Sequence, residues 1–145
     1  MRVRDTLRRK GGEVITITPD RTVLEAMRLL VEHNIGAVLV VSGEGILGIL
    51  SERDVLRLGA DDPSCLETAL VGEVMTTDLV VGVPEDAIHY AAAIMTRNRI
   101  RHLPIVEEGE LRGIVSIGDV VNAIRDQMEA ENRYLRSYIQ GGHHP

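Results

Sequence analysis

One pattern of seven residues occurs twice in the chain, first from Gly48 and again from Gly113. Residues 48–54 read Gly-Ile-Leu-Ser-Glu-Arg-Asp, and residues 113–119 read Gly-Ile-Val-Ser-Ile-Gly-Asp. Both copies contain a glycine, two apolar residues, a serine and, three residues after the serine, an aspartate. Such a repeat indicates that one folding unit is built twice in the same chain.

The duplication extends well beyond this pattern, because residues 14–56 align with residues 79–121 without a gap. Identical pairs include Pro19 with Pro84, Ala26 with Ala91, Ile35 with Ile100, Val41 with Val106 and Val55 with Val120. Each copy is too short to bury a good core alone, and 145 residues is the length of one ordinary domain. We therefore expect the two copies to share an interface.

Composition and charge exclude several classes of protein. Hydrophobic residues make up 44% of the chain but occur in short runs, so we expect no membrane span. The basic N-terminus lacks the apolar stretch of a secretory signal, and the lone Cys65 cannot form an internal disulfide, which favours the cytoplasm. A net charge of −6, with three tyrosines and no Phe or Trp, opposes nucleic acid as a ligand.

The periodicity of apolar residues predicts the same order of elements in both copies. The first copy reads as a strand over residues 14–18, a helix over 22–33, a hairpin of strands over 37–41 and 46–50, and a short helix opened by Ser51. The second reads as a strand over 80–83, a helix over 87–98, strands over 103–106 and 111–115, and a helix from Gly118 to about Tyr138. The fold class is therefore α+β.

These segments together resemble the cystathionine β-synthase (CBS) domain, and two in tandem resemble a CBS pair, or Bateman module. The resemblance rests on the two Gly-x-x-Ser-x-x-Asp segments, on residues 101–106 (Arg-His-Leu-Pro-Ile-Val) and on residues 73–76 (Glu-Val-Met-Thr). Residues 98–102, 116–121 and 138–142 resemble, more narrowly, stand-alone CBS-pair proteins of bacteria and plant organelles.

The resemblance implies two tandem β-α-β-β-α CBS units, packed by pseudo-two-fold symmetry into one Bateman module. We place the first CBS domain at residues 1–61, a linker at 62–72, the second CBS domain with an extended C-terminal helix at 73–140, and a tail at 141–145. It also implies a cleft between the copies with two quasi-equivalent sites for an adenine nucleotide such as AMP, ADP, ATP, NAD(H) or S-adenosylmethionine.

The repeated Ser and Asp suit such a ligand chemically. A serine at the start of a helix adds a hydroxyl to unpaired backbone N–H groups, which favour a phosphate. The aspartate can accept two hydrogen bonds from a ribose diol, and Gly48 or Gly113 would let a ligand approach the backbone. The alternative is that Ser51 with Asp54, and Ser116 with Asp119, are only helix-capping boxes. Duplication of the pair in register favours the nucleotide site.

In the family, the Ser and Asp of one copy face the residues that lead into the hairpin of the other copy. Ser51 and Asp54 would then face Arg101 and His102, with Arg53 nearby, whereas Ser116 and Asp119 would face Gly36 and Ala37. Because only the first set is basic, we expect it to hold the more phosphorylated ligand. The alternative is that Arg97, Arg99 and Arg101 form a solvated cluster at a helix end.

The family holds adenine with apolar and backbone groups near the first strand and the hairpin. For one site these would be residues 77–80, including Thr77 and Val80, with Ile49. For the other they would be residues 12–15, including Ile15, with Ile114. Residues 1–13 differ from residues 66–78, so the second of these adenine sites is expected to be weaker or empty.

The residue inventory predicts no enzyme and no cofactor. Lys10, the only lysine, lies in a terminus expected to fray, and the sequence contains no Gly-x-x-x-x-Gly-Lys motif. Cys65 has no assigned basic partner, and His33, His89 and His102 lack the spacing of a metal motif. We therefore expect a regulatory module that reports energy or redox state to an unidentified protein.

The last helix leaves a second class of function open. Its apolar residues recur at helical spacing, which suits either a core or contact with another chain. They are Val120, Val121, Ile124, Met128, Tyr134, Leu135 and Tyr138. Members of the family commonly pair two modules into a homodimer, and we expect one here; the alternative function is ligand-independent interaction or dimerisation.

Overall fold

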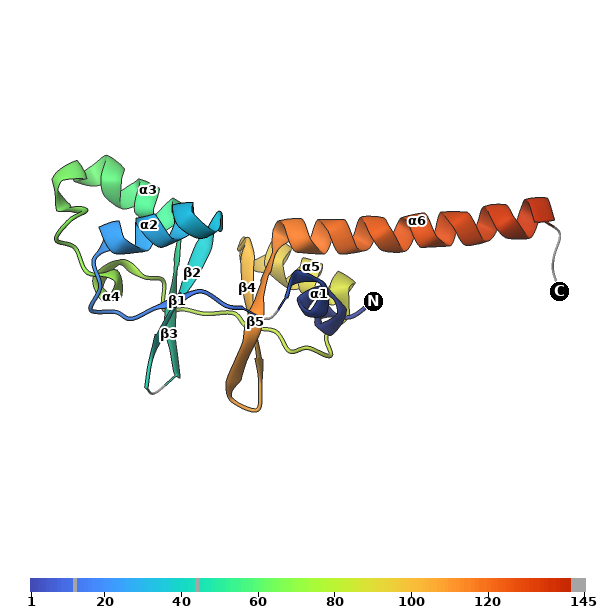
Figure 1. The fold of residues 1–145 in the computed structure, drawn as a ribbon, viewed down its shortest axis with the longest axis horizontal. Coiled ribbons are helices and arrows are strands. Elements are labelled where there is room, and N and C mark those ends of the chain that lie inside the picture. Colours follow the sequence, from blue (N-terminus) through green and yellow to red (C-terminus); the bar gives the residue numbers. More distant parts are fainter. Residues whose placement is uncertain (12, 44, 142–145) are drawn as a thin grey trace. The chain divides into compact units, whose positions relative to one another are not determined.

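A computed structural model describes residues 1–11, 13–43 and 45–141, with side chains as far as residue 139. Most of the expected tail, residues 142–145, and Gly12 of the expected adenine site lie outside the described residues. The chain forms two compact units (Figure 1). Unit 1 combines Met1–Gly12 with Val81–Pro145, and unit 2 is Glu13–Val80.

Unit 2 carries a three-stranded sheet in the order β1-β2-β3, with β1 parallel and β3 antiparallel to β2. Its elements are β1 (Thr16–Ile17), α2 (Val23–His33), β2 (Ala37–Ser42), β3 (Gly45–Ser51), α3 (Glu52–Asp61), the 3-10 helix η1 (Pro63–Cys65) and α4 (Val71–Val74). Thr22 caps α2 by accepting a hydrogen bond from the Glu25 amide, which confirms the expected capping spacing.

Unit 1 carries an antiparallel two-stranded sheet of β4 and β5. Its elements are α1 (Val3–Lys10), α5 (Ile88–Asn98), β4 (His102–Glu107), β5 (Glu110–Ser116) and α6 (Ile117–Gly141). The helix α1 contacts β5 and α6, and α5 contacts α6. Both units thus mix helices with a small sheet, which confirms the α+β class.

The structure repeats with the same offset as the sequence. Across the hairpins, Ala37 pairs with Ser51 in unit 2, and His102 pairs with Ser116 in unit 1. The register shifts between Val40 and Val41 in β2 and between Ile105 and Val106 in β4, so even the bulge is duplicated.

The first strand of each copy is shorter than expected. In unit 2 the strand covers only Thr16 and Ile17, and Ile17 pairs with Val40. The strand predicted over residues 80–83 is wrong, since a single parallel bridge joins Gly82 to Ile105 there. This bridge keeps the register of the Ile17–Val40 pair, and in both copies a proline without an N–H to donate, Pro19 or Pro84, follows two residues later.

The core of unit 2 explains why the pattern of apolar residues is a reliable guide. Val23, Ala26 and Leu30 lie on one face of α2 at helical spacing and are buried. Ala26 and Leu30 pack with alternating strand residues in a core that comprises Ile17, Ala26, Leu30, Val38, Val40, Leu50 and Val71. Complete burial of one such side chain stabilises the fold by about 1.5–3 kcal/mol.

Two helices precede the repeats and were not predicted: α1 joins the second repeat, and α4 joins the first. The amide of Arg4 donates to the carbonyl of Pro84, and the amide of Gly72 donates to the carbonyl of Pro19. Pro19 and Pro84 occupy equivalent positions of the repeat. The donors, Arg4 and Gly72, are separated by three more residues than the two prolines are. The entrance segments, residues 1–8 and 69–76, therefore correspond with a three-residue shift.

This shift explains why the two entrance segments look unrelated in an ungapped comparison. When the shift is applied, Val-Arg-Asp-Thr-Leu at 3–7 matches Val-Gly-Glu-Val-Met at 71–75. Asp5 accepts a hydrogen bond from the Arg2 amide at 2.9 Å, and Glu73 accepts one from the Leu70 amide at 2.9 Å. The expectation of a frayed N-terminus was wrong, because α1 is anchored at the same place on its repeat as α4.

Candidate functional site

Ser51 and Asp54 form a reciprocal cap at the start of α3. The Ser51 amide donates to Asp54 Oδ2 at 2.9 Å, and the Asp54 amide donates to Ser51 Oγ at 3.3 Å. The Ser51 hydroxyl also donates to Asp54 Oδ2, at 3.1 Å. Both side chains remain only partly buried, so a ligand could still reach them.

Ser116 and Asp119 repeat this cap at the start of α6. The Ser116 amide donates to Asp119 Oδ2 at 2.8 Å, and the Asp119 amide donates to Ser116 Oγ at 3.1 Å. The capping interpretation is therefore confirmed for both pairs. It does not exclude a ligand, because each carboxylate keeps a second oxygen and each helix start keeps backbone N–H groups.

The two aspartates differ in the side chain that approaches them from the residues preceding each repeat. In unit 2, Thr76 Oγ1 lies 3.4 Å from Asp54 Oδ1. In unit 1, Lys10 Nζ lies 2.7 Å from Asp119 Oδ2. The expectation that Ser116 and Asp119 lack a basic neighbour was wrong: the chain's only lysine forms an ion pair with Asp119.

The lysine also changes the titration of Asp119. Partial burial alone would raise the pKa of Asp119, but hydrogen bonds from Lys10 and Ser116, together with the positive charge of Lys10, outweigh it. The pKa of Asp119 therefore lies below its usual value, and this carboxylate is ionised at neutral pH.

The same two residues, Thr76 and Lys10, also form hydrogen bonds with the backbone of the second hairpin strand in their unit. In unit 2, Ile49 exchanges two backbone hydrogen bonds with Thr76, at 2.9 and 2.8 Å. In unit 1, the carbonyl of Ile114, which stands at the position equivalent to Ile49, accepts a hydrogen bond from Lys10 Nζ at 2.8 Å. A lysine ammonium thus takes the place at the sheet edge that a backbone N–H holds in the other repeat.

The repeated glycines make room for the entrance segments. A Cβ at Gly48 would lie 2.7 Å from the Thr76 carbonyl oxygen and 2.8 Å from Met75 Sδ. A Cβ at Gly113 would lie 2.7 Å from Leu7 Cδ2, and Leu7 is the counterpart of Met75 at the three-residue shift. The expected role of these glycines was to admit a ligand, but the structure gives protein packing as their role.

The remaining predicted site residues divide between the units. Unit 2 holds Ile15, Gly36, Ala37, Ile49, Ser51, Arg53, Asp54, Thr77 and Val80, and unit 1 holds Arg101, His102, Ile114, Ser116 and Asp119. Within one repeat, the Gly36 carbonyl accepts from the Glu52 amide, and the Arg101 carbonyl accepts from the Ile117 amide, both at 2.9 Å. The pairing of Ser51 with Arg101 joins two units and stays a prediction.

Sequence reasoning missed Thr76 and Lys10 as neighbours of the two aspartates. A signal was present, because the entrance segments align once the first copy is allowed three extra residues after position 8. Within the described ranges, no cluster of three or more His, Cys, Asp or Glu residues is arranged to hold a metal ion. No helix in those ranges is both long enough and apolar enough to span a bilayer.

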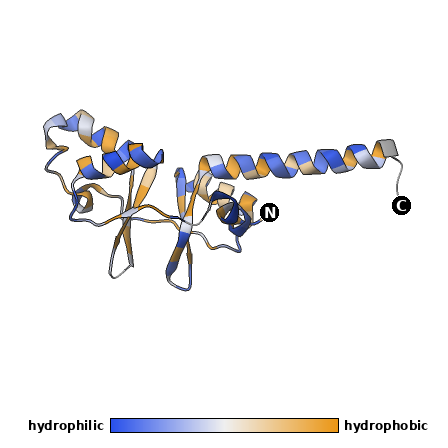
Figure 2. Ribbon diagram, in the orientation of Figure 1, coloured by the Kyte–Doolittle hydropathy of each residue, from blue (hydrophilic) through white to orange (hydrophobic). Residues whose placement is uncertain are grey.

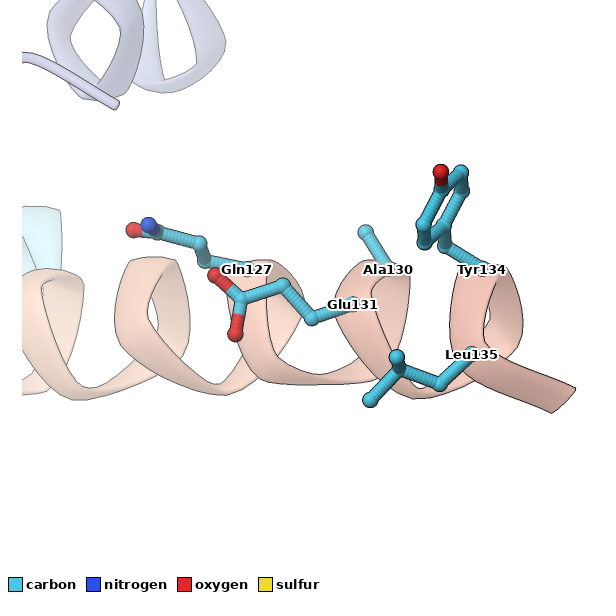
Figure 3. A pocket seen from close by; sticks show the side chains of 5 residues that line it. All are labelled: Gln127, Ala130, Glu131, Tyr134 and Leu135. Atoms are coloured by element: carbon cyan, nitrogen blue, oxygen red, sulfur yellow. The ribbon is translucent and has the colours of Figure 1, made fainter. Parts of the chain in front are cut away.

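A pocket of different character lies on α6. It is lined by Gln127, Ala130, Glu131, Tyr134 and Leu135, which project from successive turns of this one helix (Figure 3). It is separate from the capping residues at the start of α6, and its lining includes no residue predicted for nucleotide binding.

The duplicated fold and the paired Ser-x-x-Asp caps define a class of protein. The CBS domain family model matches residues 3–61 and again residues 71–126, so the chain belongs to the CBS domain family. Its two tandem CBS repeats form a Bateman module, as the sequence predicted. The second match ends at Asp126, whereas α6 continues to Gly141.

Among known proteins, the chain is similar to the CBS domain-containing protein CBSX3, mitochondrial, of Arabidopsis thaliana. The two are 37% identical over 97% of this chain and 73% of the relative. Identity to the CBS domain-containing protein YhcV of Bacillus subtilis is 39%, over 81% of each chain. The crystal structure of the CBS-domain containing protein ATU1752 from Agrobacterium tumefaciens superposes with a TM-score of 0.81 at 40% identity, covering 85% of this chain and 98% of that one.

Proposed function

We propose that this protein is a non-catalytic regulatory module that binds adenine nucleotides, such as AMP, ADP, ATP or NAD(H), at its two Ser-x-x-Asp sites. The observation that carries the proposal is the duplication of one polar arrangement in register. Ser51 with Asp54 and Ser116 with Asp119 start helices at equivalent hairpin ends and cap them in the same way.

The chemistry of each pair matches the ribose and phosphate of a nucleotide. The carboxylate oxygen that is not engaged in the cap can accept hydrogen bonds from a ribose diol. The serine hydroxyl and the N–H groups of the first helical turn can donate to a phosphate, which the helix dipole also favours. A pair that served only as a cap would not need the added contacts of Thr76 and Lys10 with the carboxylates.

A structural relative supports the class of ligand. The CBS domain pair of MJ0100 was crystallised in complex with 5′-methylthioadenosine and S-adenosylmethionine. It superposes with a TM-score of 0.76 at 21% identity, covering 88% of this chain and 98% of that one. At that identity the likeness concerns the fold, and it supports the view that this fold can accommodate an adenosine compound.

The finer assignments belong to the same proposal. Arg101, His102 and Arg53 would complete the Ser51 site and contact its phosphates, while Gly36 and Ala37 would line the Ser116 site. Adenine would lie against Ile49 with Thr77 and Val80 in one site, and against Ile114 with Ile15 in the other. The bound nucleotide would alter what an unidentified partner protein recognises, in the cytoplasm, which requires different affinities for two states of the module.

A thermal-shift panel tests the proposal, because a ligand stabilises the folded state according to its concentration relative to its dissociation constant. At 100 times the dissociation constant, the stabilisation is about 2.7 kcal/mol. We expect the full chain to respond to at least one of AMP, ADP, ATP, NAD(H) and S-adenosylmethionine. No response to any of them would contradict the proposal.

Matched variants separate ligand binding from helix capping. Asp54→Ala and Asp119→Ala remove both a cap and a proposed ribose contact. Glu73→Ala removes the equivalent carboxylate of the α4 cap, which no predicted site includes. The proposal expects a smaller nucleotide response in each of the first two variants, because each keeps one of the two sites, and an unchanged response in Glu73→Ala. Equal responses in all three would leave only the capping role.

A second candidate function, self-association, is favoured by the far end of α6. From Met128 to Ile139 the helix continues beyond the part of the chain that the CBS model matches, and its large apolar side chains are exposed. The segment carries Met128, Tyr134, Leu135, Tyr138 and Ile139, which are between 53% and 77% exposed. Figure 2 shows hydrophobic residues recurring along this helix. We propose that a second copy of the chain covers it.

A further inference from the structure

Lys10 occupies the two groups of unit 1 that a nucleotide would need. Its ammonium lies 2.7 Å from Asp119 Oδ2, the cap oxygen of the carboxylate whose other oxygen is proposed to bind the ribose, and 2.8 Å from the Ile114 carbonyl, beside the proposed adenine position. The Lys10 side chain is 35% exposed and that of Asp119 is 21% exposed. The ion pair is thus partly shielded from water but open to exchange with a ligand.

The geometry of α1 explains how the lysine reaches this place. Whereas α4 ends at Val74 and lets Thr76 pair with the sheet edge, α1 remains helical through Lys10. The extra turn brings the lysine to the sheet edge, and the helix ends at Gly11, whose φ of +91° suits glycine. The first copy therefore presents a flexible cation where the second copy presents a neutral hydroxyl and an N–H.

We propose that Lys10 makes the Ser116/Asp119 site selective for adenosine compounds that carry a phosphate. This inference rests on the proposed nucleotide function and adds a residue that decides which ligands the site accepts. A ribose diol that binds the other oxygen of Asp119 shares the charge of one carboxylate with the ammonium on Oδ2, and so weakens the ion pair. A phosphate on the same ligand gives the ammonium a new anionic partner within reach of its four-carbon chain.

The inference adds a positive charge to the Ser116/Asp119 site, which was expected to lack one. An uncharged nucleoside would weaken the Lys10–Asp119 pair and give the ammonium no new anionic partner, so the lysine works against it. A phosphorylated nucleoside exchanges one charge-assisted contact for another. At the Ser51/Asp54 site the corresponding side chain is the neutral Thr76, which imposes no such discrimination.

Calorimetry with AMP and with adenosine tests the inference in the Asp54→Ala background, where only the Ser116/Asp119 site remains. Adding Lys10→Met should weaken AMP binding about tenfold, because a charged hydrogen bond is lost. The same change should strengthen adenosine binding about two- to threefold, because no ion pair needs to be weakened. Lys10→Arg should keep the preference for AMP.

Arg8→Met is the matched control, since it removes an exposed positive charge from the same end of α1 and leaves the Lys10–Asp119 pair in place. An unchanged ratio of AMP to adenosine affinity in Lys10→Met, or an equal change in Arg8→Met, would overturn the role of Lys10. If the Asp54→Ala parent and the unmodified chain bind neither compound, this inference fails, and the proposed function fails as well if the unmodified chain also gives no response to the rest of the nucleotide panel. Binding with an unaltered ratio leaves the proposed function intact and removes only this inference.

A second measurement needs no substitution at all. Because Lys10 is the only lysine, labelling with 15N-lysine gives one side-chain ammonium signal in the full chain. Saturation with AMP should move this signal and slow its exchange with water, whereas adenosine should release the ammonium to solvent and speed up the exchange. An ammonium signal that responds to neither ligand while calorimetry records binding would overturn the inference.

Discussion

Gly48 and Gly113 stand at equivalent places in the two hairpins, but different kinds of atom face them. Gly48 faces the backbone carbonyl of Thr76, which is fixed by its two hydrogen bonds with Ile49. Gly113 faces the end of the Leu7 side chain, and a rotation about its side-chain bonds can move it away. The same substitution therefore has unequal consequences at the two positions.

We expect Gly48→Ala to lower the free energy of unfolding by about 1–3 kcal/mol, the usual cost of forcing a methyl group into a filled space. Gly113→Ala should cost clearly less, since only the Leu7 methyl group must move. Urea unfolding of both variants, followed by circular dichroism, measures the difference. Equal losses of unfolding free energy in the two variants would contradict this expectation, because they would show that the Thr76 backbone moves as easily as the Leu7 side chain.

At the scale of elements, α2 and α5 both end in a left-handed residue, but the two residues differ in how well they tolerate that conformation. Asn34 and Arg99 both adopt the left-handed conformation, at φ 52° and 55°, and close their helices with backbone hydrogen bonds. Asparagine tolerates this conformation, whereas a long side chain such as arginine is strained in it. The duplicated helix end is therefore better built in the first repeat than in the second.

We expect Arg99→Gly to raise the free energy of unfolding by about 0.5–1 kcal/mol, because glycine relieves the strain and the exposed side chain packs little. Asn34→Gly is the matched control and should change stability by only a few tenths of a kcal/mol. Thermal unfolding of the two variants checks this. A stability gain at Asn34 as large as that at Arg99 would contradict the assignment of strain.

How far the elements could be predicted depended on local pattern. The helices α2 and α5 and both hairpins follow from apolar spacing and turn residues, since those signals lie within each segment. The short helix α4 has only four residues, and α1 has a polar, arginine-rich sequence, so neither carries a strong periodic signal. The neighbour that stabilises each of them, such as Pro84 for α1, is far away in the chain.

At the scale of the whole molecule, the candidate site too could be predicted where its signal is local and could not where it depends on a distant contact. Ser51, Asp54, Ser116 and Asp119 could be chosen from the sequence because they repeat at a constant spacing. Lys10 could not be chosen in this way, because an ungapped alignment misaligns the entrance segments by three residues and hides the place of Lys10 relative to the repeat. The charge of a site can therefore depend on a tertiary contact between distant parts of the chain, here between Lys10 near its start and Asp119.

The C-terminal part of α6 has the features of a surface for self-association. The side chains of Met128, Tyr134, Leu135 and Ile139 are more than half exposed on this segment, and a helix gains most of its stability when such an apolar face is packed. Glu129 and Glu131 precede Arg133 and Arg136, so a second copy lying antiparallel would bring the acidic half of one helix to the basic half of the other. Self-association of α6 satisfies both requirements.

We expect sedimentation equilibrium to show a dimer of the full chain at micromolar concentration and a monomer for Leu135→Glu, because a charge in the apolar stripe opposes burial there. Leu56→Glu is the control, since Leu56 is 75% exposed but lies on α3. It should leave the dimer intact. High salt should weaken the dimer moderately if the opposed charges contribute. A monomeric wild-type chain, or a dimer that survives Leu135→Glu, would exclude α6 as the self-association surface.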